Sequence, residues 1–289
     1  MEINKPDGLL LVDKPTGMTS HDVVAIARHA VGVRRIGHAG TLDPFATGLL
    51  VLLVGNATRL LPYVEGEPKV YEATIRFGIE TDTADLTGMP TREAPLPSEA
   101  AVADAVAALT GSIQQIPPAY SAKQVAGVRA YAAARRGTPL ELQPVAVVVH
   151  GWEIASRRGS DWDVTITCGG GTYVRALARD LGALAGSAAH LVALRRVRSG
   201  RFDVVSAIDV DTVRAGAAVV LPARTAVPSL PVEELDDDAL LRVAQGQQIP
   251  ATVDGSRAAL VGRDGALVAI AERAGQAWRP RTVLRPGRG

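Results

Sequence analysis

Apolar and polar positions alternate with different periods along this chain, and three segments have the pattern of strands. Gly8 to Val12 is a short apolar run that ends at Lys14-Pro15, and a proline favours an extended conformation in the residue before it. Between Val70 and Phe77, apolar residues alternate with polar ones, as expected for a strand with one buried face. Trp162 to Cys168 alternates in the same way. The first segment predicts an apolar β-strand, and the two alternating segments predict half-buried β-strands.

Other segments have the period of a helix. Ser20 is the predicted N-cap of a helix that Gly32 ends, with an apolar stripe through Val23, Val24, Ala27, Ala30 and Val31. Ser98 and Gly111 bracket a second helix, rich in alanine and valine. Thr172 is expected to start a third, whose core stripe consists of Val174, Leu177, Leu181 and Leu184.

Strand and helix segments interleave without the regular alternation of a parallel βαβ fold, which predicts an α+β protein with a mixed, mainly antiparallel sheet flanked by helices. Towards the C-terminus the apolar segments become short, and Asp264-Gly265 between two of them indicates a hairpin. We therefore expect two domains, one of residues 1–228 and a small β-rich one of residues 229–289.

Composition narrows the class of protein. Of 289 residues, 47% are hydrophobic and 21% charged, as in a soluble folded protein. The N-terminus lacks the features of a signal peptide, and no segment approaches the ~20 apolar residues of a membrane span, so a cytoplasmic protein without membrane contact is expected. Cys168 is the only cysteine, which excludes an internal disulfide, and the histidines have no zinc-ligand spacing. No metal is expected.

The net charge of +1 does not by itself indicate a nucleic-acid partner, but the charges are unevenly distributed. Acidic residues concentrate between Glu233 and Asp238. Solvated surface is the alternative explanation for each charged run, and together they favour a polyanion-binding face. The basic runs contain Lys123, Arg129, Arg135 and Arg136, and, further on, Arg195, Arg196, Arg198 and Arg201.

Three residues could carry chemistry. Asp43 lies in a glycine-rich loop whose nearest formal charges are basic, which keeps a carboxylate ionised, although aspartate before proline is also a common turn former. Tyr71 is on the apolar face of its strand, where a core aromatic is the simpler interpretation. Arg175 lies in the first turn of a helix, where a cation opposes the macrodipole and needs another partner, and a carboxylate such as Asp43 would suit.

Seven segments of the chain together closely resemble the TruB family of tRNA pseudouridine synthases, in family order over roughly the first 200 residues. The most specific segment is GHAGTLDPFATGLL, from Gly37 to Leu50. The others are Gly8 to Ser20, Lys69 to Gly78, Glu80 to Asp85, Ile116 to Lys123, Gly171 to Gly182 and His190 to Arg196. The resemblance implies the pseudouridine synthase fold and an enzyme that isomerises a uridine in the T-loop of tRNA, uridine 55, to pseudouridine.

The resemblance also assigns roles to residues. It implies that Asp43 is the catalytic aspartate, that Tyr71 stacks on the target base and takes part in the proton-handling step, and that Arg175 forms an ion pair with Asp43. Lys14, Tyr173 and Leu194 would surround the pocket, and His38 would fill the gap left by extruded nucleotides. Residues 119–144 resemble a thumb that closes on RNA, and the C-terminal segment corresponds to a PUA-type RNA-binding module. The expected RNA contacts are His38, Arg34, Arg35, Lys123, Arg129, Arg135, Arg136, Arg195 and Arg196.

The implied reaction is an isomerisation that consumes no electrons, water or phosphoryl groups, so no cofactor is expected. The expected partner is the T-arm stem-loop of tRNA, bound by a monomer. Two alternatives stay open. The chain could be an RNA-binding or RNA-folding protein without chemistry, or a synthase for another RNA such as ribosomal RNA.

Overall fold

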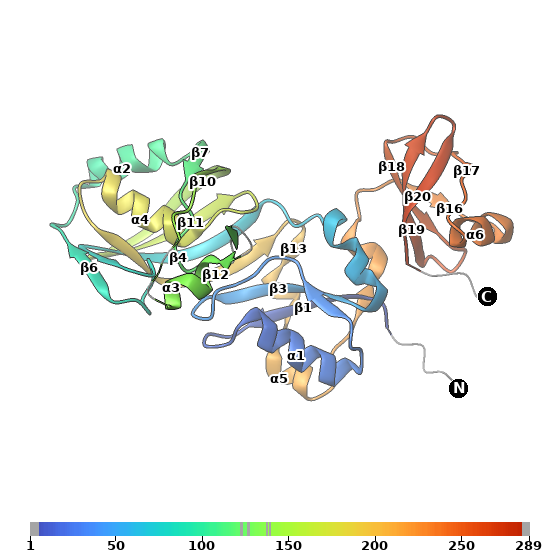
Figure 1. Ribbon diagram of the computed structural model, residues 1–289, viewed down its shortest axis with the longest axis horizontal. Coiled ribbons are helices and arrows are strands. Elements are labelled where there is room, and N and C mark those ends of the chain that lie inside the picture. Colours follow the sequence, from blue (N-terminus) through green and yellow to red (C-terminus); the bar gives the residue numbers. More distant parts are fainter. Residues whose placement is uncertain (1–5, 122–123, 126–127, 137, 139, 285–289) are drawn as a thin grey trace. The chain divides into compact units, whose positions relative to one another are not determined.

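The computed structural model describes residues 6–121, 124–125, 128–136, 138 and 140–284 (Figure 1). They form two compact units. Unit 1 consists of Met1–Pro44, Leu49–Glu65 and Val204–Gly289, and unit 2 of Phe45–Gly48 and Gly66–Asp203, within the described residues. Each unit combines segments that are separate in the sequence, so this division does not test the predicted domain boundary near residue 228, which stays a prediction.

In unit 1, β1 pairs in parallel with β14 and antiparallel with β15, and β2 pairs antiparallel with β3. Its elements up to residue 226 are β1 (Gly8–Lys14), α1 (Ser20–Val31), β2 (Ile36–His38), β3 (Thr47–Val54), the 3-10 helix η1 (Gly55–Tyr63), η2 (Val204–Ser206), β14 (Ile208–Asp209), α5 (Val210–Arg214), β15 (Leu221–Pro222) and η3 (Ala223–Ala226). Helices α1 and α5 pack side by side, as Figure 1 shows.

The N-cap of helix α1 lies one residue earlier than the sequence predicted. Its N-cap is Thr19, whose hydroxyl accepts a hydrogen bond from the backbone of Asp22, while the Asp22 side chain accepts one from the Thr19 backbone. This capping box satisfies the first turn, so the predicted N-cap Ser20 was wrong. Gly32 ends the helix in a left-handed conformation, as expected. Ser20, Val23, Val24 and Ala27 form its buried face.

The C-terminal part of unit 1 has its own five-stranded sheet, in the order β16-β18-β19-β20-β17. Its elements are β16 (Val232–Glu234), α6 (Asp237–Ala244), β17 (Ile249–Pro250), β18 (Arg257–Val261), β19 (Leu267–Ala274) and β20 (Ala277–Val283). Trp278 and Leu260 are among its fully buried core residues. The hairpin at Asp264-Gly265 is confirmed, and Glu233, the first residue of the acidic run, is only 4% exposed.

One residue of the acidic run, Glu233, is a buried carboxylate with a structural role. Glu233 accepts hydrogen bonds from the backbone and hydroxyl of Thr252, from the backbone of Val253 and from the indole of Trp278. Burial raises the pKa of Glu233, but these hydrogen bonds outweigh it, and the pKa lies below its ordinary value.

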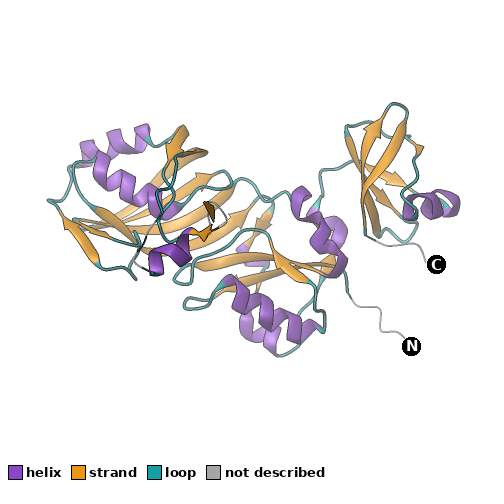
Figure 2. Cartoon of the chain, viewed as in Figure 1, coloured by secondary structure: helices purple, strands orange, loops and turns teal. Residues whose placement is uncertain are grey.

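In unit 2, neighbouring strands pair antiparallel in the order β12-β4-β11-β10-β7, and β13 pairs with the end of β12. Helices α2 and α4 pack against each other, and Figure 2 shows them as neighbouring purple coils. The elements are β4 (Lys69–Phe77), β5 (Ile79–Thr81), β6 (Pro90–Glu93), α2 (Glu99–Ala108), β7 (Gly111–Gln115), β8 (Gln124–Val125), β9 (Val128–Arg129), α3 (Ala130–Arg135), β10 (Val145–Arg158), β11 (Asp161–Cys168), α4 (Val174–Leu184), β12 (Ala189–Ser199) and β13 (Phe202–Asp203).

The alternating strands of unit 2 are as predicted, with Tyr71, Ala73, Ile75 and Phe77 all buried along β4. Two details of α4 were wrong. Its N-cap is Tyr173, because the Thr172 hydroxyl donates back to the carbonyl of Gly169 instead of capping the helix. Leu184, predicted in the core stripe, is 56% exposed at the last position of the helix.

Gly48, at the start of β3, lies where only glycine fits. Residues 47 and 48 pair in parallel with Arg195 and Arg196 of β12. The φ angle of Gly48 is 102°, and a Cβ atom there would lie 2.3 Å from the carbonyl oxygen of Arg196.

Mixed sheets with helices on their faces make this an α+β protein, as predicted. No described helix is long and apolar enough to cross a membrane.

Candidate active site

Asp43 lies in unit 1, partly buried, on a loop whose backbone is bonded on both sides of it. On the N-terminal side, the Ser20 hydroxyl accepts a hydrogen bond from the Leu42 nitrogen at 2.9 Å and donates one to the Leu42 oxygen at 3.1 Å. On the C-terminal side, the Pro44 oxygen accepts a hydrogen bond from the Gly17 nitrogen at 2.7 Å. The residues that flank the carboxylate are therefore fixed.

Lys14, which the resemblance places near the pocket, is fully buried. Its ammonium donates to the carbonyls of Pro15 at 2.9 Å, Met18 at 2.8 Å and Pro44 at 3.4 Å. A buried ammonium needs such acceptors, and these carbonyls belong to the turn after β1 and to the Asp43 loop. Lys14 thus ties the end of β1 to the loop that carries Asp43.

His38 is the last residue of β2, just before the same loop. Its ring packs edge to face against His21 at the start of α1, with the ring centroids 5.6 Å apart. The two rings join the start of α1 to the start of the Asp43 loop.

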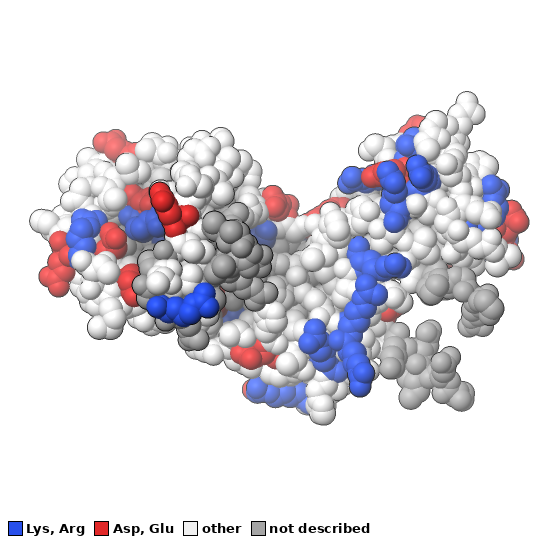
Figure 3. All heavy atoms as spheres, viewed as in Figure 1, with Lys and Arg blue, Asp and Glu red and all other residues white. Residues whose placement is uncertain are grey.

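The C-terminal end of α1 carries a basic surface. The exposed arginines of this region are Arg28, Arg34 and Arg35, with Arg59 on η1. In Figure 3, blue atoms form a stripe over the part of the molecule where α1 ends and η1 lies. Between Asp22 and Asp43 the sequence has no acidic residue. We call these four arginines the α1–η1 basic surface.

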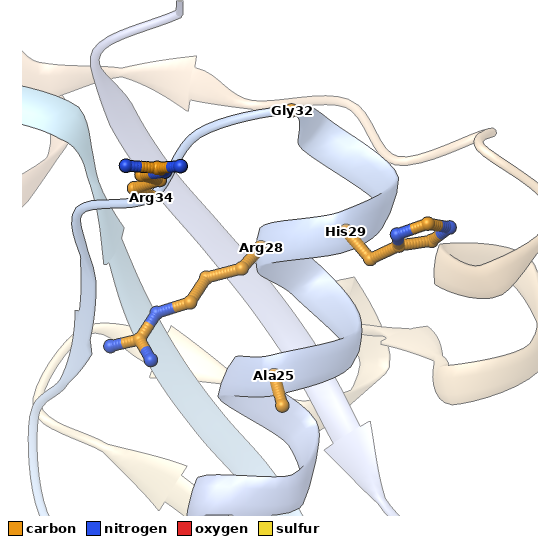
Figure 4. A pocket seen from close by; sticks show the side chains of 5 residues that line it. All are labelled: Ala25, Arg28, His29, Gly32 and Arg34. Carbon is orange, nitrogen blue, oxygen red and sulfur yellow. The ribbon is translucent and has the colours of Figure 1, made fainter.

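An open hollow on this surface is lined by Ala25, Arg28, His29, Gly32 and Arg34 (Figure 4). The side chains of Arg28 and His29 leave the helix in opposite directions, and Arg34 lies beyond its end. Arg28 also donates to the carbonyl of Ile36 at 3.0 Å. Because these groups do not converge on one point, the hollow suits an extended polyanion better than a small ligand.

In unit 2, Arg175 is 4% exposed in the first turn of α4. Its guanidinium donates to the carbonyls of Thr83 at 3.0 Å and Tyr120 at 2.9 Å, and lies 3.6 Å from a carboxylate oxygen of Asp85. The need of this cation for a carboxylate was predicted, but Asp85 was not named as its partner. Because Asp43 belongs to unit 1, its predicted ion pair with Arg175 stays a prediction.

Asp85 is the functional-site candidate that the sequence reasoning missed. It is 4% exposed, and its Oδ1 accepts hydrogen bonds from the Thr83 hydroxyl and from the backbone and hydroxyl of Thr87. It closes the Glu80–Asp85 segment, which the family resemblance had included without assigning a role. A buried carboxylate beside a buried arginine neutralises the charge that each would otherwise carry alone.

Tyr71 and Leu194 lie on neighbouring strands of unit 2, and each is 7% exposed. In the pairing of β4 with β12, Tyr71 is opposite Arg196 and Ala73 is opposite Leu194. The backbone of Tyr173 is held by the side chain of Gln115, which is fully buried. The Gln115 amide oxygen accepts a hydrogen bond from the Tyr173 backbone nitrogen at 2.9 Å, and the Gln115 amide nitrogen donates one to the Tyr173 carbonyl oxygen at 3.2 Å. The structure thus brings Tyr71 and Leu194 onto one pair of strands.

The predicted RNA contacts in unit 2 differ in their exposure. Arg195 is partly exposed and Arg136 is exposed. Arg196 is only 1% exposed, so its guanidinium is not available as part of a surface patch, contrary to the expectation from the basic run. Arg129 ends β9 and Arg135 ends α3, and only their backbone is described. Lys123 lies outside the described residues.

Two further groups near the Gly169–Gly171 turn have shifted pKa values. Burial lowers the pKa of Lys69, and burial raises the pKa of the Cys168 thiol to about 11. A thiol with so high a pKa is almost entirely protonated at neutral pH, which disfavours Cys168 as a nucleophile. Within the described part of the chain, no three His, Cys, Asp or Glu side chains are grouped so that they could hold a metal ion.

Comparison with known proteins agrees with these features. A family model described as "TruB family pseudouridylate synthase (N terminal domain)" matches residues 28–174, and one described as "tRNA pseudouridylate synthase B C-terminal domain" matches residues 175–227. The chain is 44% identical over 288 residues to tRNA pseudouridine synthase B of Thermobifida fusca (strain YX), covering 96% of this chain and 98% of that one. It is 48% identical over 232 residues to the protein of the same name from Leifsonia xyli subsp. xyli (strain CTCB07), covering 77% and 76%.

Solved structures share the fold. A chain in the crystal structure of a Cbf5-Nop10-Gar1 complex superimposes with a TM-score of 0.70 at 24% identity, over 96% of this chain and 85% of that one. A chain of the archaeal box H/ACA sRNP Nop10-Cbf5 complex gives 0.71 at 23% identity, over 99% and 88%.

The fold and the family matches together define an RNA pseudouridine synthase, an isomerase that acts on uridine. Within that class, the chain belongs to the TruB family.

Proposed function

We propose that this enzyme converts a uridine in the T-loop of tRNA, uridine 55, to pseudouridine, with Asp43 as the essential carboxylate acting on a flipped-out nucleotide. The relatives at 41% to 48% identity carry the name tRNA pseudouridine synthase B, which supports tRNA as the substrate. The observation that carries the role of Asp43 is its setting, since the loop backbone is bonded at both neighbouring residues while the carboxylate stays partly exposed. A preorganised charged group of this kind is what catalysis requires.

The chemistry needs one carboxylate and an enclosed base. The bond from N1 to C1′ breaks, the uracil turns, C5 bonds to C1′, and the C5 proton is lost while N1 gains one, so that the product is an isomer. A carboxylate can serve by attacking C1′ or by accepting the C2′ proton. Asp43 has the charge and the exposure for either role. The detached uracil must be kept from turning freely or leaving, and the Tyr71 ring can provide a platform for it.

A uridine in a folded loop must be unstacked before it can react, at a cost of a few kcal/mol. Cationic side chains that bind the flanking phosphates offset that cost. The α1–η1 basic surface belongs to the same unit as Asp43, and two of its exposed arginines, Arg34 and Arg35, directly precede β2 and its loop. We assign this surface to the RNA backbone, together with Arg136 and Arg195 in unit 2.

The central test replaces Asp43 with asparagine. Pseudouridine formation in a T-arm stem-loop should fall by about 10³-fold or more, because the essential group is removed, while RNA affinity stays within about twofold. Asp211→Asn is the matched control, since Asp211 is an exposed carboxylate of the same unit that pairs with the nearby Arg214. Undiminished modification by Asp43→Asn would refute the catalytic role. Equal modification of a ribosomal RNA fragment would refute the choice of substrate.

The assignment of the basic surface has its own test. The double variant Arg34→Ala/Arg35→Ala should weaken T-arm binding and reduce the slope of log affinity against log salt by about two, one for each lost phosphate contact. Arg263→Ala is the control, because Arg263 is exposed but already lies 3.6 Å from Asp237. An unchanged slope would remove this surface from the RNA-binding face.

A further inference from the structure

Ser20 makes an unusual pair of hydrogen bonds for a residue at the start of a helix. Its side chain is buried, with an exposure of 1%, and its hydroxyl binds both backbone groups of Leu42, which lies 22 residues further along the chain. Serine at a helix start usually caps the helix, but Thr19 already does so here. The Ser20 hydroxyl is therefore not needed for α1 and serves the Asp43 loop instead.

The two bonds restrict the backbone immediately before Asp43. Each peptide group is planar, so a bond to the Leu42 nitrogen fixes the plane that precedes this residue, and a bond to its oxygen fixes the plane that contains the Asp43 nitrogen. On the other side, Pro44 has a fixed φ angle and confines the residue before it to extended conformations. Few degrees of freedom are left for the backbone of Asp43.

We infer that Ser20 is a positioning residue that orients the Asp43 carboxylate by clamping Leu42. It acts through the backbone and does not itself contact the reacting atoms. This role rests on the proposed function of Asp43. Lys14 and Gly17 hold the loop from the Pro44 side, whereas Ser20 binds both backbone polar groups of Leu42 on the other side of Asp43.

The neighbouring residue provides a matched control. Thr19→Ala removes the N-cap of the same helix and weakens α1, but it leaves the hydroxyl of Ser20 and its bonds to Leu42 in place. Ser20→Ala removes the clamp and leaves the cap. Ser20→Cys keeps nearly the same volume with a much weaker hydrogen-bonding group, so it tests the clamp even if Ser20→Ala folds poorly.

The experiment measures three quantities for each variant: the single-turnover rate constant on a T-arm stem-loop, the affinity for that RNA, and hydrogen–deuterium exchange in a peptide containing Leu42. Ser20→Ala and Ser20→Cys should lower the rate constant roughly 10- to 100-fold, since a misplacement of about 1 Å has this effect, with affinity changed by less than about twofold. The Leu42 amide should exchange faster, because it loses its acceptor. Thr19→Ala should leave both the rate constant and this amide as in the parent protein.

The possible failures can be told apart when Asp43→Asn is measured in the same assay. If Asp43→Asn is inactive but both Ser20 variants react at the rate of Thr19→Ala, the positioning role is refuted and the proposed function stands. If the Ser20 variants lose RNA affinity and not rate, Ser20 acts in binding, which also refutes the inference. If Asp43→Asn keeps full activity, the proposed function and the inference built on it both fail.

Discussion

Asp85→Asn tests whether burial, more than distance, decides the strength of an ion pair in unit 2. The substitution removes the negative charge beside Arg175 and keeps an oxygen that can still accept from Thr87. The side chains of Arg175 and Asp85 are 4% and 5% exposed. Removing one partner of a buried pair typically costs about 3–5 kcal/mol, because the remaining charge stays desolvated. The separation of 3.6 Å places the expected loss near the lower end, at about 3 kcal/mol.

Asp161→Asn is the matched control from the same unit. Its partner Arg76 makes two close bonds of 2.7 Å to the carboxylate, but the side chains are 43% and 21% exposed. The hydrogen bonds from Arg76 hold the pKa of Asp161 below its ordinary value. Solvent screening nevertheless limits exposed pairs to about 0–1 kcal/mol. The pair with the shorter distances is therefore expected to contribute less.

Urea unfolding followed by circular dichroism gives the free energy of unfolding for both variants. We expect Asp85→Asn to lower the free energy of unfolding at least about twice as much as Asp161→Asn does. At about 2–4 °C per kcal/mol, Asp85→Asn should lower the melting temperature by roughly 6–12 °C. It should also lower the rate of pseudouridine formation if Arg175 acts in the site. Equal losses in the two variants, or a larger loss in Asp161→Asn, would show that desolvation of Arg175 is not the dominant effect.

Two further predictions concern buried polar groups. Gln115→Ala should lower the free energy of unfolding by about 1–3 kcal/mol, because the buried backbone groups of Tyr173 lose their partners, and a urea midpoint equal to that of the parent protein would contradict this. For Glu233, whose pKa is lowered, the carboxylate contributes stability above its unfolded pKa of about 4.3, and this contribution is lost as the pH falls through the lower folded value. Glu233→Gln should therefore melt at a lower temperature than the parent at pH 7, by a difference that shrinks towards pH 3. A difference independent of pH would show that the carboxylate charge is not responsible.

The strands β1, β4 and β11 were predictable because their evidence is local. The alternation from Val70 to Phe77 needs only one buried face to appear in the sequence, and β4 has that face. The cap of α1 was also within reach. Asp22 follows Thr19 by three residues, which is the spacing of a capping box, but Ser20 is an equally good capping residue by type. A serine beside a threonine leaves the choice to the tertiary structure.

The partner of Arg175 shows where local reasoning ends. The first turn of a helix disfavours a cation, and from this the sequence indicates that Arg175 needs another partner, for which a carboxylate would suit. Which carboxylate approaches it depends on how the segment after β5 folds back on α4, and no periodicity in the chain encodes that contact. Asp85 became visible only when the structure placed its carboxylate 3.6 Å from the guanidinium.

The same limit explains why both backbone clamps were missed. Ser20 and Gln115 are polar residues, and a polar residue in a sequence is read as a cap, a turn or solvated surface. Both are buried, at 1% and 0% exposure, and each spends its hydrogen bonds on the backbone of a residue far along the chain. A buried polar side chain is tolerated only where its bonds are satisfied, so its presence marks a backbone that must stay in one conformation. In this enzyme the two residues held in this way are Leu42, next to Asp43, and Tyr173, next to the turn that carries Arg175. Substitution of Ser20 or Gln115 should therefore lower turnover before it lowers RNA affinity.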